Sequence, residues 1–299
     1  MNKTFNLGSQ FPITIFALFK QPAANNMMLL IDTSQETGTT ALTEKGKVLF
    51  SEENKIAKEH ASWLHVAIGR ILVEAKITVR DLKAIAVVAG PGSYTGLRVG
   101  MAAAKGFCYA LKIPLITQNT LRVMAESMIS VAEEKGAWIC PMIDARREEV
   151  FTALFTVNGQ RSTVNDKSVN RQPSTVNQIT VNGQRSTVND KTVNQFTVND
   201  PSVNHQPSTV NHLEEILPPQ AMILDKSAFE IQLTENPILF FGTGANKWEK
   251  ITNAANALFY PQLDTIHAFA KLAQRDFDSQ TWADPVYSEP VYLKEFFSY

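Results

Sequence analysis

The pattern of apolar residues near the start of the chain predicts a group of short strands. Leu29–Thr33 is an apolar run that ends in polar residues, as a buried strand does. Thr39–Thr43 and Val48–Glu52 follow as two further strands, joined by a turn at Lys45–Lys47. Together the three runs predict an antiparallel meander at the front of a domain.

Two long helices and a buried strand are predicted next. In His60–Ala75 the apolar residues recur at helical spacing but cover more than one stripe. This helix is therefore either buried on two sides or in contact with a partner. The unbroken apolar run Leu82–Ala89 predicts a strand that is covered on both faces. It leads through a Gly-Pro-Gly turn into the second helix, Tyr94–Leu111.

The same alternation continues along the rest of the chain and predicts the α/β class. Two prolines, Pro285 and Pro290, predict an extended tail over Asp284–Leu293. The remaining predicted elements are helices at Thr120–Glu134 and Ile266–Arg275, and strands at Leu115–Gln118, Ala137–Asp144, Glu149–Phe155, Met222–Leu224 and Pro237–Phe241.

A repetitive segment interrupts this pattern between Thr156 and His212. The unit Thr/Ser-Val-Asn recurs ten times there, and Thr156–Lys167 reappears unchanged as Thr180–Lys191. A packed core needs different residues at each level, and this segment holds too little apolar bulk to offset the entropy of ordering it. We interpret residues 156–212 as a disordered insert within one domain. Short strand-like turns and a dedicated binding array are the alternatives.

Composition narrows the classes of protein. The chain of 299 residues has 28 basic and 29 acidic side chains and a formal net charge of −1. Autonomous nucleic-acid binding needs clustered Lys and Arg, so it is not expected here. No apolar run is long enough to span a bilayer. Cys108 and Cys140 lie in apolar runs, which indicates small buried residues rather than a disulfide or metal framework.

Residues 1–26 precede the first predicted strand, and we interpret them as a disordered N-terminal extension. Met27 and Met28 stand directly before that strand, so the natural start could lie at either of them. The apolar run Phe11–Phe19 leaves a weak signal peptide as an alternative, although no small-residue cleavage site follows it.

The segment from Gly90 to Gly100 carries the first candidate site. Gly90, Gly92 and Ser93 form a turn whose serine stands at the N-cap position of the second helix. Free N–H groups at such a helix start could bind an anion. However, neither the Gly-Lys-Ser/Thr of a phosphate-binding loop nor the dinucleotide glycine pattern is present. A capped turn without a ligand is the alternative.

A strip of small residues on the second helix suggests close helix packing. Gly96, Gly100 and Ala104 follow one another at intervals of four, and each glycine inside a helix costs about 1 kcal/mol relative to alanine. We expect the helix that contains Gly69 to pack here and the pair to present a shared apolar face. Packing inside one core is the alternative. If the face is an interface, Gly100→Leu should break association while the domain stays folded. The candidate interface residues are His60, Leu64, Ile68, Gly69, Leu72, Gly96, Leu97, Gly100 and Ala104.

Two other short motifs are weaker. Asp32, Thr33 and Ser34 resemble the first phosphate loop of the actin, Hsp70 and sugar-kinase superfamily, and Gly242 and Gly244 echo its adenosine loop. A polar strand end and a common glycine pair are the alternatives.

Further polar residues suggest no catalytic or metal site. Asp144 could be a second acidic group, or it could pair with Arg146 or Arg147. His60 and His65 do not lie on one helix face as a zinc pair would, so no metal site is expected.

Taken in order, several motifs resemble the TsaB (YeaZ) family, and residues 28–155 fit it most closely. The specific part is the run Gly90–Gly100; the supporting motifs are Leu29–Ser34, Glu59–His60, Ile143–Arg146 with Glu149–Val150, Gly242–Gly244 and Glu289–Leu293. The insert and the N-terminal extension have no counterpart in the family. The resemblance implies a duplicated actin-like (ribonuclease H-like) fold, with a complete N-terminal lobe over 27–118. A reduced C-terminal lobe over 119–155 and 213–299 completes it.

The resemblance also implies a role. It implies a cytoplasmic, non-catalytic subunit of the complex that forms N6-threonylcarbamoyladenosine at position 37 of ANN-decoding tRNAs. Such a subunit forms a heterodimer with its paralogue TsaD through the two helices, and the ATPase TsaE joins them. ATP and metal are used by the partners, tRNA is contacted only indirectly, and a homodimer can form when TsaD is absent. Of the paralogue's two metal-binding histidines only His60 has a counterpart here.

Three other classes of function remain open. An actin-like ATPase or small-molecule kinase would use Asp32 and the glycine loops, and would bind magnesium ATP tightly. A protease-like enzyme would retain zinc. If the insert is an interaction module, its deletion should abolish function.

Overall fold

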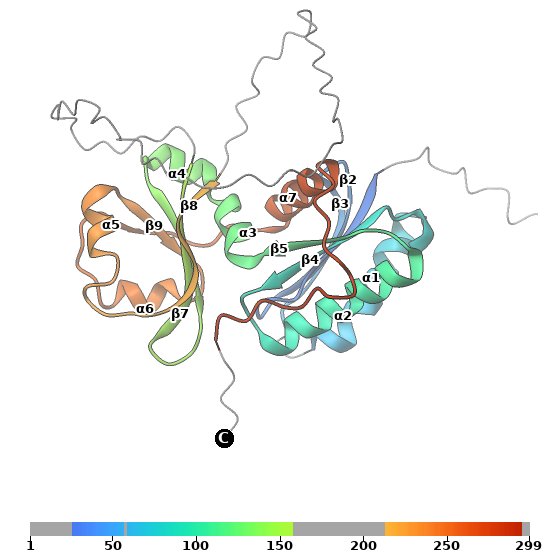
Figure 1. Cartoon of the computed structure of the whole chain (residues 1–299), viewed down its shortest axis with the longest axis horizontal. Helices are drawn as coiled ribbons and strands as arrows, with labels where there is room; N and C mark the ends of the chain where they lie inside the picture. The colour runs from blue at the N-terminus through green and yellow to red at the C-terminus, as the bar shows by residue number, and fades with distance from the viewer. Residues whose placement is uncertain (1–25, 57–58, 158–212, 295–299) are drawn as a thin grey trace, which may run out of the picture.

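The structure is a computed structural model that describes residues 26–56, 59–157 and 213–294, with two lobes built on two five-stranded sheets (Figure 1). The sheet of the first lobe has the strand order β3-β2-β1-β4-β5. Its strands are β1 (Met27–Asp32), β2 (Gly38–Glu44), β3 (Lys47–Asn54), β4 (Ala84–Gly90) and β5 (Leu115–Asn119). The helices of this part are α1 (His60–Glu74), the short 3₁₀ helix η1 (Val79–Asp81) and α2 (Tyr94–Leu111).

The second sheet repeats the arrangement of the first. Its order is β8-β7-β6-β9-β10 when read from its antiparallel end. In both sheets three antiparallel strands are followed by two parallel ones. The strands are β6 (Trp138–Asp144), β7 (Glu149–Val157), β8 (Leu213–Ile223), β9 (Ile238–Phe241) and β10 (Ala257–Phe259). This duplication confirms the predicted actin-like α/β fold.

The central strand β1 shows how the first lobe is held together. All six of its residues are buried, and their side chains alternate between the two faces of the sheet. Leu29 and Ile31 pack against α1 and α2, whereas Met28 and Leu30 pack on the opposite face against α7 (Ile266–Asp278). An unbroken apolar strand is therefore covered on both sides, as its sequence predicts.

The position of α7 corrects one predicted domain boundary. Residues 213–299 are assigned to the C-terminal lobe by the sequence, but Ile266, Phe269 and Leu272 of α7 are buried in the core of the first lobe. Sequence order alone assigns α7 to the second lobe, because the residues that cover it are far away along the chain. The first lobe therefore comprises 26–119 together with α7.

The second lobe has two cores, one on each face of its sheet. On one face α3 (Thr120–Ser127) and α4 (Ile129–Lys135) pack against β6, β7 and β9. On the other face, α5 (Glu230–Glu235) and α6 (Ala245–Glu249) enclose Trp248 and the aromatic rings of Phe229 and Phe240.

Two elements differ from the predicted ones. The single helix predicted over Thr120–Glu134 is broken at Met128, whose φ of −106° and ψ of 2° lie outside the helical range. Strand β8 is much longer than the predicted Met222–Leu224, because an edge strand tolerates Pro218 and Pro219 in its middle. Nearly all of the predicted extension and of the predicted insert lies outside the described residues.

The segment that follows α7 runs past α2 toward the second lobe (Figure 1). Its Ala283 amide donates to the Leu115 carbonyl at 2.8 Å, and its Val291 amide donates to the Ala89 carbonyl at 2.7 Å. Lys294 then donates to the Ala145 carbonyl of the second lobe at 3.1 Å. This tail thus ties the two lobes together. No helix in the described part of the chain is long and apolar enough to cross a membrane.

Candidate functional site

The structure brings the two predicted loops of the first lobe together. The Ser93 amide donates to the Ser34 carbonyl at 2.7 Å, and the Thr33 hydroxyl donates to the Gly96 carbonyl at 2.7 Å. Ser93 accepts a hydrogen bond from the Gly96 amide at 3.3 Å, so it is the N-cap of α2 as predicted. The contact joins the C-terminal end of β1 to the start of α2.

Asp32 is enclosed in this contact. One of its carboxylate oxygens accepts from the Ser34 amide at 2.9 Å and from the Ser34 hydroxyl at 2.7 Å. Burial raises the pKa of Asp32, and these two hydrogen bonds and the nearby His60 offset that effect only in part. His60 is also buried, and its Nε2 lies 3.0 Å from the Gln35 carbonyl, which can only accept a hydrogen bond.

Replacing Asp32 with asparagine should remove a pH-dependent cost of folding. The asparagine oxygen can still accept both Ser34 hydrogen bonds. Since the folded-state pKa of Asp32 is raised above its ordinary value of 3.8, the contribution of Asp32 to stability is fully present in acid and is lost as pH rises through the folded-state pKa. Urea unfolding from about pH 4 to about pH 7 should show the Asp32→Asn variant gaining stability relative to the wild type. A difference in unfolding free energy that stays constant with pH would contradict this.

The glycines of the turn are explained by contacts within the chain. A Cβ at Gly92 would lie 2.1 Å from the Ser34 carbonyl oxygen. A Cβ at Gly90, whose φ is +115°, would lie 2.7 Å from the carbonyl oxygen of Val291 in the tail. The backbone of the tail therefore occupies the approach to Gly90, which makes the turn a packing feature of this structure.

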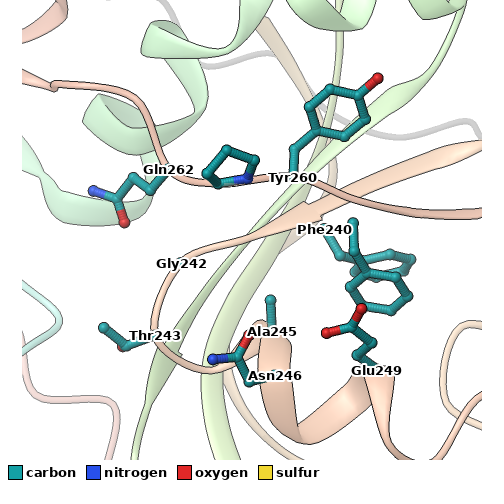
Figure 2. A pocket seen from close by; sticks show the side chains of 10 residues that line it. Phe240, Gly242, Thr243, Ala245, Asn246, Glu249, Tyr260 and Gln262 are labelled. Carbon is teal, nitrogen blue, oxygen red and sulfur yellow. The ribbon is translucent and has the colours of Figure 1, made fainter.

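The second predicted glycine pair lies in the other lobe, beside a pocket of about 430 Å³ (Figure 2). Gly242 and Thr243 line the pocket, and Gly244 packs on β6 and Val150. Its wall also carries Phe240, Ala245, Asn246, Glu249, Phe259, Tyr260, Pro261 and Gln262. The sequence indicates the glycine pair but not this pocket, because β10 and the residues after it are not recognised from pattern.

The strip of small residues on α2 faces inward, which corrects the predicted interface. A Cβ at Gly96 would lie 2.0 Å from the Thr33 carbonyl oxygen, and one at Gly100 would lie 2.4 Å from the Thr33 hydroxyl. The strip therefore packs against β1 within one core. His60, Leu64, Ile68, Leu72, Leu97 and Ala104 are likewise buried inside the chain. Gly100→Leu would disrupt the fold and cannot report on association.

Gly69 is the exception among those residues, because it is exposed and nothing lies within 4 Å of its Cβ position. The same is true of Gly106 on α2, which sequence reasoning missed. The two helices are neighbours, and the rings of His65 and Phe107 lie 6.0 Å apart between them. We call the outward residues of this helix pair the outer helix face: Val66, Gly69, Val73, Ala102, Gly106 and Tyr109.

The outer helix face is apolar for an exposed surface. Val73 is 78% exposed, Tyr109 is 83% exposed and Val66 is 54% exposed. An interior helix glycine costs about 1 kcal/mol relative to alanine, and no contact within the described chain requires glycine at either position. Residues that cost stability and leave a helix backbone bare are typical of a surface where another backbone approaches closely.

In the second lobe Asp144 pairs with a lysine rather than with an arginine side chain. Its carboxylate accepts from the Lys247 ammonium at 2.6 Å and from the backbone amide of Arg146 at 2.6 Å. Partial burial acts to raise the pKa of Asp144, but these contacts hold it below its usual value.

The described residues contain no group of three or more His, Cys, Asp or Glu side chains that could hold a metal ion. Cys108 and Cys140 are buried and free, as the sequence predicts. Burial raises the pKa of both thiols to about 12, so neither is a nucleophile at neutral pH.

Comparison with known proteins shows which protein families the chain is similar to. The family model of TsaD, tRNA N6-adenosine threonylcarbamoyltransferase, matches residues 54–267. The tRNA threonylcarbamoyladenosine biosynthesis protein TsaB of Bacillus subtilis is 33% identical over 128 residues, which cover 43% of this chain and 54% of that protein. TsaB of Buchnera aphidicola subsp. Schizaphis graminum is 35% identical over 144 residues, which cover 48% of this chain and 67% of that protein.

A solved structure from Pseudomonas aeruginosa, of a protein described as similar to the peptidase YeaZ, has the same fold. Its TM-score is 0.63 at 19% identity, and the match covers 90% of this chain and all of that one. The sequence matches are shorter: the chain spans 54% and 67% of the length of the two curated relatives described above. With these matches and the described fold, the chain belongs to the TsaB (YeaZ) family.

Proposed function

We propose that this protein takes part in the synthesis of threonylcarbamoyladenosine in tRNA as a non-catalytic subunit that binds a TsaD-type transferase. The curated relatives are named for that biosynthesis, and the matching family model is that of the transferase itself. The observation that carries the proposal is the outer helix face, an exposed apolar surface with two glycines whose Cβ positions meet nothing within 4 Å in the described chain.

The first lobe favours binding over chemistry. Asp32 is buried and closed by Ser34, and the backbone of the tail lies against Gly90. The two thiols are held protonated. A subunit of this kind acts by binding the competent form of its partner more tightly than other forms. TsaE would join the pair, and ATP and metal would be used by the partners.

The test is co-expression of the full chain with the TsaD paralogue of the same organism, followed by size-exclusion chromatography and calorimetry. We expect a stable complex and no turnover of magnesium ATP by the isolated chain. Association of this chain with itself alone, unaffected by the paralogue, would contradict the heterodimer. Turnover by the isolated chain would favour the ATPase or kinase alternative.

Removal of residues 158–212 should leave both the fold and partner binding intact. The ladder between β7 and β8 pairs Val157 with Leu213, so the two ends of the deletion are already neighbours. An Asn-Gly pair can join them, because two-residue loops with this sequence close antiparallel hairpins. The deleted chain should bind the TsaD paralogue within about twofold of the wild-type affinity, a difference below about 0.4 kcal/mol. Loss of binding in a chain that still unfolds cooperatively would instead assign the interaction to the repeats.

A further inference from the structure

The hairpin between β6 and β7 ends in two strained arginines. Arg146 has a φ of 66° and Arg147 a φ of 53°, so both are in the left-handed region, and both are exposed. This conformation costs roughly 1–2 kcal/mol per residue for side chains other than glycine, and asparagine tolerates it better than arginine does. The backbone of this turn therefore favours glycine or asparagine, and two arginines stand there instead.

Two lysine side chains stabilise this turn by hydrogen bonds to its backbone carbonyls. The Lys247 ammonium donates to the Arg147 carbonyl at 2.6 Å and to the Glu149 carbonyl at 3.2 Å. Lys294 of the tail donates to the Ala145 carbonyl at 3.1 Å. The same lysines pair with the nearby carboxylates, Lys247 with Asp144 and Lys294 with Glu149. The charge of Arg146 helps to lower the pKa of Asp144, but neither guanidinium donates a hydrogen bond to a carboxylate of the described residues, and both residues are exposed.

The duplicated fold does not require these side chains. The equivalent turn of the first lobe starts at Asp32, which accepts from the amide two residues later, just as Asp144 accepts from the Arg146 amide. There the next residues, Thr33 and Ser34, are small and completely buried against the start of α2. The two turns share this aspartate hydrogen bond but not the backbone that follows it, because the left-handed φ angles of Arg146 and Arg147 have no counterpart at Thr33 and Ser34.

The surroundings of the two arginines indicate the kind of ligand. They do not line the pocket of Figure 2, and they stand at the exposed tip of a hairpin. A small nucleotide needs a concave site, whereas a long chain of phosphates can be bound by a protruding one. Guanidinium groups bind phosphate in a bidentate manner. We propose that Arg146 and Arg147 bind the phosphodiester backbone of the tRNA on which the complex acts, a direct contact in place of the indirect one that the family resemblance implies. The identity of this RNA rests on the proposed function.

The test replaces both arginines with the residues that the turn favours, as Arg146→Asn with Arg147→Gly. Because asparagine and glycine accept the left-handed conformation, the thermal midpoint of this variant should not fall below that of the wild type. The control is Arg80→Gln with Lys83→Gln, which also removes two positive charges. Both residues are exposed and lie in the first lobe, just before the N-terminal end of β4.

The readout is the affinity of each complex with the TsaD paralogue for a tRNA transcript, measured by fluorescence anisotropy at several salt concentrations. The hairpin variant should bind about tenfold more weakly. The slope of log K against log salt concentration should be smaller in magnitude by roughly 1.5, because two phosphate contacts are lost. The control should keep the wild-type slope. Equal slopes in the hairpin variant and the wild type, or an equal loss in the control, would overturn the proposal.

Two further outcomes are separable from these. If the hairpin variant loses affinity for magnesium ATP but keeps its affinity for tRNA, the arginines bind a nucleotide and the proposal is wrong. If the wild-type chain does not associate with the TsaD paralogue, the proposed function fails. In that event the same tRNA titration at low salt, made with the isolated full-length variants, still decides whether the hairpin binds RNA.

Discussion

A tryptophan in place of Gly106 should abolish the complex with the TsaD paralogue while the chain itself stays folded. Nothing lies within 4 Å of the Cβ position at Gly106, so the isolated chain has room for the large side chain. A partner backbone packed on the outer helix face does not have that room. We expect at least a hundredfold loss of affinity by calorimetry, which corresponds to about 2.7 kcal/mol.

The matched control is Ser130→Trp, which changes another exposed helix position, on α4 of the second lobe, and should bind normally. A complementary variant carries alanine at both Gly69 and Gly106. Each replacement should stabilise the isolated chain by about 1 kcal/mol, because alanine favours the helix and meets nothing in the chain. A Gly106→Trp protein that binds the partner at full strength would show that the interface lies elsewhere.

Alanine at Gly96 should destabilise the chain severely, in contrast to alanine at Gly106 on the same helix. The added methyl group would lie 2.0 Å from the Thr33 carbonyl oxygen, so α2 and β1 must move apart. That movement also breaks the hydrogen bond from the Thr33 hydroxyl to the Gly96 carbonyl. We expect a loss on the order of 4 kcal/mol, at the upper end of single substitutions.

Urea unfolding of the isolated chain measures this loss directly. Gly100→Leu should behave in the same way, since its Cβ would lie 2.4 Å from the Thr33 hydroxyl. Gly106→Ala in the same assay provides the control, because it tests alanine at another position of α2 without the contact to β1. If Gly96→Ala unfolds at the wild-type urea concentration, the close approach of α2 and β1 is not required for stability.

The order of strands and helices could be predicted wherever the local pattern is strong. β1, α1, α2 and β6 each lie within two residues of their predicted limits, because apolar period and turn residues are set by neighbours in sequence. α7 was predicted as a helix, but its place on the first sheet could not be, since that depends on contacts with residues far away in the chain.

The candidate site shows the same division. Spacing established that Gly96, Gly100 and Ala104 share one side of α2, but periodicity does not say whether that side faces a sheet or a partner. Burial against β1 decides the matter, and it moves the proposed interface to Gly69 and Gly106. The sequence suggests Arg146 and Arg147 only as partners for Asp144, because the left-handed backbone of the pair has no signature in the local pattern.

The placement of α7 has a consequence for synthesis on the ribosome. Until residues 266–278 have emerged, the core around Met28, Leu30 and Ala86 lacks α7, and Val123 of α3 is the other helical residue of that core that is already present. The second lobe and the repeats are translated after the strands of the first sheet and before α7. The nascent first lobe therefore exposes part of an apolar sheet face for that interval, and exposed surface of this kind is where chaperones bind and aggregation begins.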